Sequence, residues 1–170
     1  MKGYGGGFLF KIGERIVYPM HGAGIIEGVE EKEILGEVRK YYVVYMPMGD
    51  MRVLVPVDNA DNIGLREISS MDVLELSFAV LKDDKTKMPE NWNRRYRENL
   101  DKLKSGDILE VSDVVRNLII MEEERGLSTG ERKLLNSAKQ MLFTEVSLIK
   151  GLQQDDVEKL IYSMVLHQKE

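Results

Sequence analysis

The sequence predicts an α+β protein of two domains, a small SH3- or Tudor-like β-barrel followed by an all-α helical bundle. Short β-branched and aromatic runs, bounded by glycine and proline, fill residues 1–69. Apolar stripes with the period of a helix fill residues 70–170. No long flexible linker separates the two halves. We therefore expect a boundary near residue 70 and two domains in contact.

Five short strands are expected in the first domain. The apolar runs at 16–18, 41–45 and 53–55 each end at or near a proline, and residues 25–26 lie between glycines. Residues 35–37, Leu-Gly-Glu, predict a hairpin tip between two longer strands. Five short strands in about 60 residues are too few for a sandwich, but they can close as a small barrel.

A series of helices is expected in the second domain. Ser70 precedes the first helix, and Pro89 suits the first turn of the second. The third helix ends at Gly126, the capping box at 128–131 opens the fourth, and Gly151 precedes the last. The apolar stripe expected on the second helix is Trp92, Tyr96, Leu100 and Leu103.

The composition is that of a folded protein without membrane or disulfide features. Hydrophobic residues make up 43% and charged residues 31%, and no apolar run approaches the roughly 18 residues that span a bilayer. The apolar stretch at 8–10 is too short for a secretory signal, and the glycine-rich residues 1–8 are expected to form a flexible leader. The chain has no cysteine, which is compatible with a cytoplasmic location.

Charge is unevenly distributed along the chain. The net charge of −5 argues against an autonomous, tight DNA binder, because such proteins neutralise phosphates with a basic excess. Residues 82–97 nevertheless hold six bases and three acids, a net charge of +3. This combination favours a protein that another molecule brings to DNA.

No catalytic, metal or cofactor site is expected. The two histidines, His21 and His167, lie in different domains, and no metalloprotease, nucleophile-elbow or phosphate-loop motif occurs. The carboxylates at 155–158 are interpreted as acids at a helix N-terminus, where the helix dipole favours them. The sequence therefore predicts a binding protein that is not an enzyme, and a small hydrolase is the weakest alternative.

The segment 91–97 has two interpretations. It contains Trp92, the only tryptophan of the chain, among three arginines. In the first interpretation, Trp92 heads an apolar stripe and anchors its helix in the core. In the second, its ring projects from the end of the bundle, because an apolar wedge flanked by arginine is a device for entering the minor groove and unstacking a base step. Sequence spacing leaves both open.

The same segment belongs to a set of motifs that resemble a known family. In order along the chain, these are Phe10-Lys11-Ile12-Gly13-Glu14, Val17-Tyr18-Pro19 with His21-Gly22, Val55-Pro56, Asn62-Ile63-Gly64-Leu65-Arg66, Asn91-Trp92-Asn93-Arg94-Arg95-Tyr96, Lys104-Ser105-Gly106-Asp107 and Glu124-Arg125-Gly126-Leu127-Ser128. With these motifs the chain resembles the CarD/CdnL family of bacterial RNA polymerase-binding regulators. The N-terminal half alone also occurs in the transcription-repair coupling factor family, but here a helical half follows.

The resemblance implies a division of labour. The barrel is expected to dock on the β subunit of RNA polymerase, and the helical domain to meet promoter DNA at the upstream edge of the melted region. Lys32 falls at an expected polymerase contact. Leu54 departs from a basic contact of the family, and whether the nearby Arg52 compensates stays open. The candidate DNA-binding residues, with Trp92 as the wedge, are Trp92, Arg94, Arg95, Arg97, Arg132, Lys85 and Lys87.

These expectations describe a monomer, with a domain-swapped dimer as the alternative, in the cytoplasm and associated with the nucleoid. Tethering by the barrel would raise the local concentration of the helical domain to about the millimolar range, so that a weak DNA contact matters. The competing hypothesis is a protein–protein scaffold with Trp92 in the core. The solvent accessibility of Trp92 separates the two.

Overall fold

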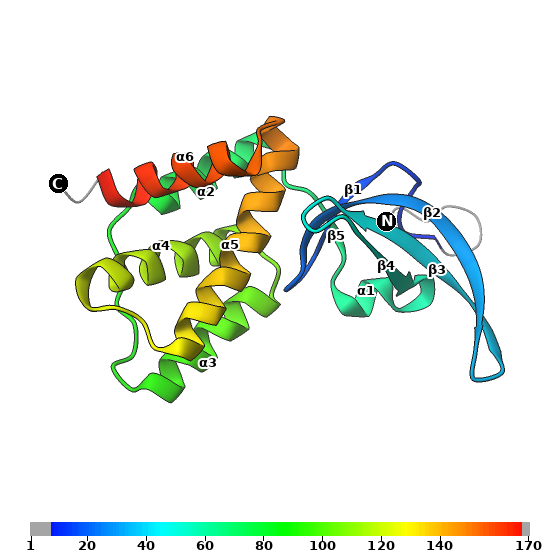
Figure 1. Cartoon of the computed structure of the whole chain (residues 1–170), viewed down its shortest axis with the longest axis horizontal. Helices are drawn as coiled ribbons and strands as arrows, with labels where there is room; N and C mark the ends of the chain where they lie inside the picture. The colour runs from blue at the N-terminus through cyan, green and yellow to red at the C-terminus, as the bar shows by residue number, and fades with distance from the viewer. Residues whose placement is uncertain (1–7, 168–170) are drawn as a thin grey trace.

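The computed structural model describes residues 8–167 and contains an antiparallel sheet followed by a helical bundle (Figure 1). This arrangement confirms the two-part α+β fold. The expected leader lies outside the described residues, except for Phe8. The ring of Phe8 packs edge-on against Tyr42, with the ring centroids 6.2 Å apart. No helix within residues 8–167 is both long and apolar enough to cross a membrane.

The sheet has five antiparallel strands in the order β4-β3-β2-β1-β5. The strands are β1 (Arg15–Tyr18), β2 (Gly22–Ile34), β3 (Glu37–Met46), β4 (Met51–Pro56) and β5 (Arg66–Glu67). The expected closed barrel is wrong, because β5 has two residues and pairs with β1 but not with β4. Two short helical elements, η1 (Val57–Asn59) and α1 (Ala60–Ile63), follow β4 instead, and their buried Val57 and Ala60 join the core of the sheet.

Five longer helices form the second domain, and they are α2 (Met71–Lys82), α3 (Trp92–Lys104), α4 (Ile108–Arg125), α5 (Thr129–Lys150) and α6 (Gln154–Leu166). Ser70 caps α2, Gly126 follows α4 and Ser128 caps α5, as predicted. The start expected at Pro89 is wrong. Helix α3 begins at Trp92, because the side chain of Asn91 accepts a hydrogen bond from the Arg94 amide at 3.0 Å.

Hydrogen bonds join the two domains directly, as expected from the absence of a linker. The guanidinium of Arg66, at the end of the sheet, forms a bidentate ion pair with Glu145 of α5, with N···O distances of 2.7 and 2.9 Å. Glu145 also accepts a hydrogen bond from the Ser69 amide at 2.8 Å. The hydroxyl of Thr144 accepts a hydrogen bond from the Ala23 amide in β2 at 2.9 Å. Bidentate pairs of this kind fix orientation as well as distance.

Helix α5 links this junction to the opposite end of the bundle. Figure 1 shows it running from a position beside α3 to the sheet. Its N-cap, Ser128, and its junction residue, Thr144, are separated by about 24 Å at the rise of an α-helix. Groups at the N-terminal end of α5 are therefore held at a fixed distance from the sheet.

Candidate functional site

Trp92 occupies the first position of α3, and Figure 1 shows this helix beginning at the end of the bundle away from the sheet. Its side chain is 40% exposed, and it is absent from both hydrophobic clusters of the described residues. Burial of a large aromatic ring is the usual outcome in a folded domain. The accessibility of this ring therefore favours a surface role over the core role that the sequence left open.

Three contacts fix the orientation of the Trp92 ring. One face stacks on Tyr96, with centroids 5.1 Å apart and an interplanar angle of 17°. The indole Nε1–H donates a hydrogen bond to the Ser128 hydroxyl at 2.9 Å. The benzenoid edge lies so close to Gly130 that a Cβ there would come within 3.1 Å of the ring. The ring is thus held by one face and one edge, which leaves its remaining surface available to a flat partner.

Arg95 does not face outward with its neighbours, which argues against its expected role as a DNA contact. It is 4% exposed, and its guanidinium forms a bidentate ion pair with Glu131, with N···O distances of 2.8 and 3.1 Å. A further guanidinium nitrogen donates to the carbonyl oxygens of Pro89 and Glu90. The hydrogen bond to Glu131 raises the pKa of Arg95, against the lowering effect of burial. Its donors are used inside the protein.

Glu131 and Ser128 form only half of the expected capping box. The Ser128 hydroxyl accepts a hydrogen bond from the Glu131 amide at 3.1 Å. The Glu131 carboxylate turns inward to Arg95 and to the Ser128 hydroxyl instead of capping the Ser128 amide. Burial raises the pKa of Glu131, but the hydrogen bonds and charge of Arg95 outweigh it, so the pKa lies below its ordinary value of 4.5. Ser128 thus links Trp92 to a buried ion pair.

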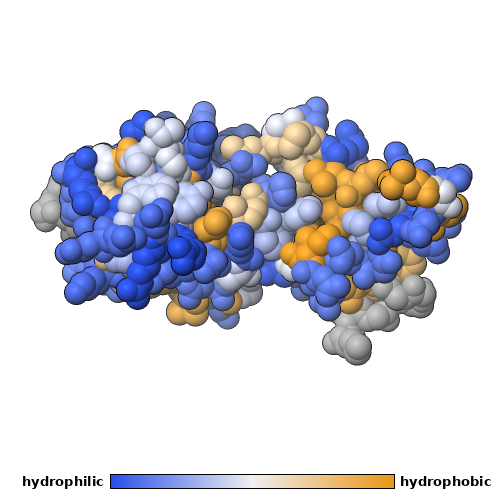
Figure 2. Space-filling model, turned by 90° about the horizontal axis from the view of Figure 1, so that it is seen from below, coloured by the Kyte–Doolittle hydropathy of each residue, from blue (hydrophilic) through white to orange (hydrophobic). Residues whose placement is uncertain are grey.

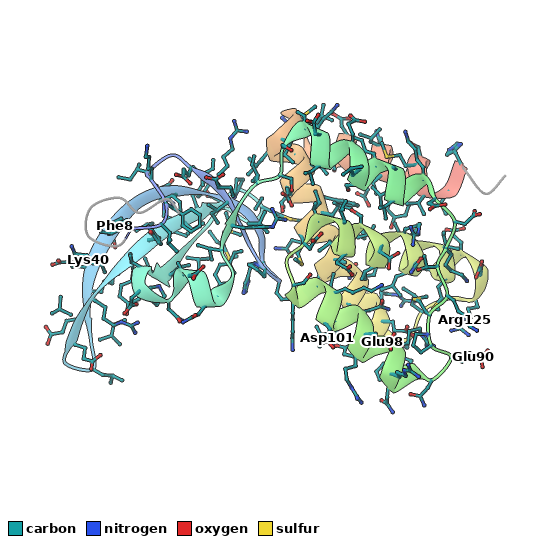
Figure 3. The ribbon with its side chains drawn as sticks, turned by 180° about the vertical axis from the view of Figure 1, so that it is seen from behind. Phe8, Lys40, Glu90, Glu98, Asp101 and Arg125 are labelled. Carbon is teal, nitrogen blue, oxygen red and sulfur yellow. The ribbon has the colours of Figure 1, made fainter. Side chains whose placement is uncertain are left out.

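The remaining candidate bases form a mixed surface rather than one uninterrupted positive face. Each of three bases has an acidic partner: Lys85 pairs with Glu124 at 2.6 Å, Arg94 with Glu98 at 3.1 Å, and Arg132 with Glu122 at 3.7 Å. Arg97 and Lys87 are exposed and form no ion pair with any residue in the range 8–167. Figure 3 shows Glu98, Glu90 and Arg125 at this end of the bundle, where acids and bases interleave.

A buried polar network fixes the irregular segment that precedes α3, and sequence reasoning missed it. The side chain of Asn117 accepts a hydrogen bond from the Thr86 amide at 3.1 Å and donates to the Thr86 hydroxyl at 2.8 Å. Arg116, 2% exposed, donates to the Val80 carbonyl at 2.7 Å. The sequence signal that could have indicated this network is the presence of Arg116 and Asn117 among the apolar residues of α4. Lys85 and Lys87 therefore project from an ordered segment.

Lys32, Arg52 and Leu54 lie on the face of the sheet opposite Tyr42 and the core. The strand register pairs Lys32 with Arg39, Arg52 with Tyr45 and Leu54 with Val43, and side chains alternate along each strand. The β3 residues opposite Lys32 and Arg52 are Arg39 and Tyr45, and along the strand these two positions are roughly 20 Å apart. Arg52 forms a bidentate ion pair with Glu27, with an N···O distance of 2.8 Å. Figure 2 shows apolar surface gathered over the sheet half of the molecule.

These features give two candidate faces, one on the sheet domain and one on the helical domain that is hydrogen-bonded to it. Residues 10–69 match the family described as the CarD-like/TRCF RID domain, and residues 77–162 match the family described as CarD, C-terminal domain. The chain belongs to the CarD family of transcription regulators, which confirms the resemblance recognised in its motifs.

A relative in Bacillus subtilis (strain 168) extends this assignment over both domains. It is named "Putative transcription factor YdeB" and is 37% identical over 150 residues, which cover 88% of this chain and 98% of the relative. The similarity therefore spans the sheet, the junction and the helical bundle together.

Proposed function

We propose that the chain docks on the β subunit of RNA polymerase through its sheet domain and stabilises the open promoter complex through Trp92. The accessibility of the Trp92 ring is the observation that carries this proposal, because a buried ring cannot enter a groove. The match of residues 10–69 to the CarD-like/TRCF RID domain supports the docking half. The chain would act by binding alone, without a catalytic step or a cofactor.

Trp92 is suited to stack on an unpaired or distorted base. Its stack with Tyr96 makes a rigid aromatic platform, and stacking one base on such a platform contributes roughly 1–3 kcal/mol. Entering a base step in closed duplex requires unstacking, which costs a few kcal/mol and least where the duplex is already distorted. The chain would therefore bind the open complex better than closed duplex, and this difference in affinity would shift the equilibrium toward opening.

The bases around Trp92 can exchange their protein partners for phosphates. Surface ion pairs such as Arg94–Glu98 contribute at most about 1 kcal/mol, so breaking them opposes DNA binding only weakly. The interleaved acids nevertheless lower the attraction to free duplex. This arrangement supports a DNA contact that is weak alone and effective when polymerase supplies the tether.

The scaffold alternative required Trp92 in the core, and the exposed ring disfavours it. The rigid junction adds a second argument for the proposal. Arg66 and Glu145 hold the helical domain in one orientation, so a docked sheet would deliver Trp92 to one position on the DNA. A scaffold that binds two independent proteins has no need of such a fixed distance.

Reversing the charge of the sheet face should weaken docking. We expect Lys32→Glu and Arg52→Glu each to reduce affinity for an isolated β-subunit fragment by roughly tenfold, mainly by slowing association. The unfolding temperature should stay nearly unchanged, because both side chains are exposed. Surface plasmon resonance and thermal unfolding on the same samples measure the two effects. Unaltered binding by both variants would place the interface elsewhere.

Removing one unpaired base should change the salt dependence of the DNA contact. Arg97→Gln should reduce the slope of log affinity against log salt by about 0.9, since one fewer counterion is released. The weakening should be similar for different promoter sequences. The measurement is open-complex stability over a salt series, with Lys159→Gln in α6 as the matched control. An unchanged slope for Arg97→Gln would mean that this side chain does not contact phosphate.

A further inference from the structure

The outer part of the β2–β3 hairpin stands alone as a two-stranded ribbon. Strand β4 pairs with β3 only from Tyr41 onward, and β1 pairs with β2 only as far as Ile25. Within residues 8–167, no further strand therefore pairs with residues 31–40, here called the hairpin tip. Figure 1 shows the hairpin projecting from the sheet on the side away from the helical bundle. Ribbons of this kind are marginally stable in water, so a long one needs a reason to persist.

Large apolar side chains gather on the hairpin tip without covering any core. Leu35 is 100% exposed, Val38 is 65% exposed and Ile34 is 48% exposed. The register places Ile34 and Val38 on opposite faces of the ribbon, with Leu35 at the turn between them. Apolar surface on both faces and at the end suits insertion into a concave site rather than contact with a flat one.

Leu35 sits where turn chemistry disfavours it. Its φ is +54° and that of Gly36 is +80°, so both central residues of the turn are left-handed. Asparagine, aspartate and glycine are preferred at such positions, and other residues there cost of order 1 kcal/mol or more in strain. In the isolated protein, a fully exposed leucine makes no buried apolar contact that would offset this strain. A strained and solvent-exposed apolar residue is typical of a side chain whose favourable contacts lie on a partner.

The charged residues nearest Leu35 indicate the kind of partner. The hairpin tip as a whole contains three glutamates and three bases and carries no net charge, but the charged residues nearest Leu35 are Glu33 and Glu37. Among the described residues, none of Glu31, Glu33 and Glu37 forms an ion pair. These two carboxylates beside Leu35 would be attracted to a protein pocket rimmed by lysine or arginine. Lys32 and its register partner Arg39 lie on the face that carries Arg52, so these bases belong to the proposed docking face, and Glu33 and Glu37 belong to a separate contact at the turn.

We propose that the hairpin tip inserts Leu35 into an apolar, basic-rimmed pocket on RNA polymerase, as a second anchor beside the strand face that carries Arg52. This inference rests on the proposed function, because it adds an anchor to the same docking event. It assigns Leu35 the role of a buried apolar anchor and assigns Glu33 and Glu37 the role of steering charges.

The experiment compares full-length variants for binding to core RNA polymerase. Leu35→Asn should weaken binding at least about tenfold, because a leucine anchor is lost from a desolvated pocket. Asparagine is preferred in the turn, so the unfolding temperature should not fall, and reduced binding cannot be attributed to unfolding. Leu35→Met should retain most of the affinity. Leu76→Gln, at a leucine of α2 that is 56% exposed, is the matched control and should leave binding unchanged.

One further variant and the pattern of outcomes distinguish failure of the hairpin anchor from failure of the proposed function. The double variant Glu33→Gln/Glu37→Gln should bind more weakly and with a shallower salt dependence, and tighter binding would overturn the basic rim. Normal binding by Leu35→Asn together with weakened binding by Arg52→Glu would overturn the hairpin anchor but preserve docking. If the wild-type chain self-associates through Leu35, and Leu35→Asn still binds polymerase normally, the partner of the tip would instead be a second copy of the chain. Failure of the wild-type chain to bind polymerase would contradict the proposed function itself.

Discussion

Trp92→Ala should shorten the lifetime of the open promoter complex by about tenfold or more, while affinity for polymerase stays unchanged. The expected factor follows from the loss of one base-stacking contact, roughly 1–3 kcal/mol, which is made only when the promoter is open. Polymerase affinity should persist because the sheet face is formed by the other domain. Open-complex lifetime after competitor challenge, measured beside polymerase binding, tests both halves.

Folding should survive this substitution with a modest loss. Truncation of a fully buried tryptophan costs roughly 3–5 kcal/mol, and a ring that is 40% exposed should cost clearly less. Trp92→Phe is the matched variant, because it keeps a ring on Tyr96 and removes the donor to Ser128 together with the edge that lies against Gly130. Its lifetime should lie between those of wild type and Trp92→Ala. A functional defect that merely tracks the loss of folded protein would make Trp92 a core residue.

Local patterns in the sequence predict most elements of the fold. The turn at Leu35-Gly36, the cap at Ser70 and the helix end at Gly126 each depend on a few adjacent residues, and the structure contains all three. Closure of the sheet depends instead on two strands that are far apart in the chain. Pattern alone could not reveal that β5 is too short to reach β4, so the barrel was a wrong prediction.

The candidate site shows the same limit at the level of single residues. The apolar positions of α3 formed a stripe beginning at Trp92 that sequence spacing left open as core or surface, and the residues buried in the helix are Arg95, Asn99 and Leu103. Burial of Arg95 depends on Glu131, which lies 36 positions later in the chain. Without that partner, a helix places its arginine outward and its tryptophan inward. The burial of Arg95 therefore depends on a distant ion pair that helix periodicity alone does not reveal.

That ion pair leads to the largest expected change in stability. Arg95→Met should lower the free energy of unfolding by roughly 3–5 kcal/mol at neutral pH, because it leaves the Glu131 carboxylate buried and unpaired. The double variant Arg95→Met/Glu131→Leu should recover most of this loss, since apolar side chains of similar volume can replace a buried pair. Urea unfolding of the three proteins measures the pattern.

The pH dependence of these variants gives an independent check. In the wild type the folded pKa of Glu131 is depressed, so the stability it contributes is present above the ordinary value of 4.5 and is lost as pH falls through the folded pKa. In Arg95→Met, burial without a partner should raise the pKa of Glu131. Acidification should therefore narrow the difference in the free energy of unfolding between this variant and the wild type. Arg95→Met should also leave the salt slope of open-complex stability unchanged, in contrast to Arg97→Gln. A stable Arg95→Met variant with a reduced salt slope would mean that Arg95 turns outward to phosphate, and that Trp92 is held without it.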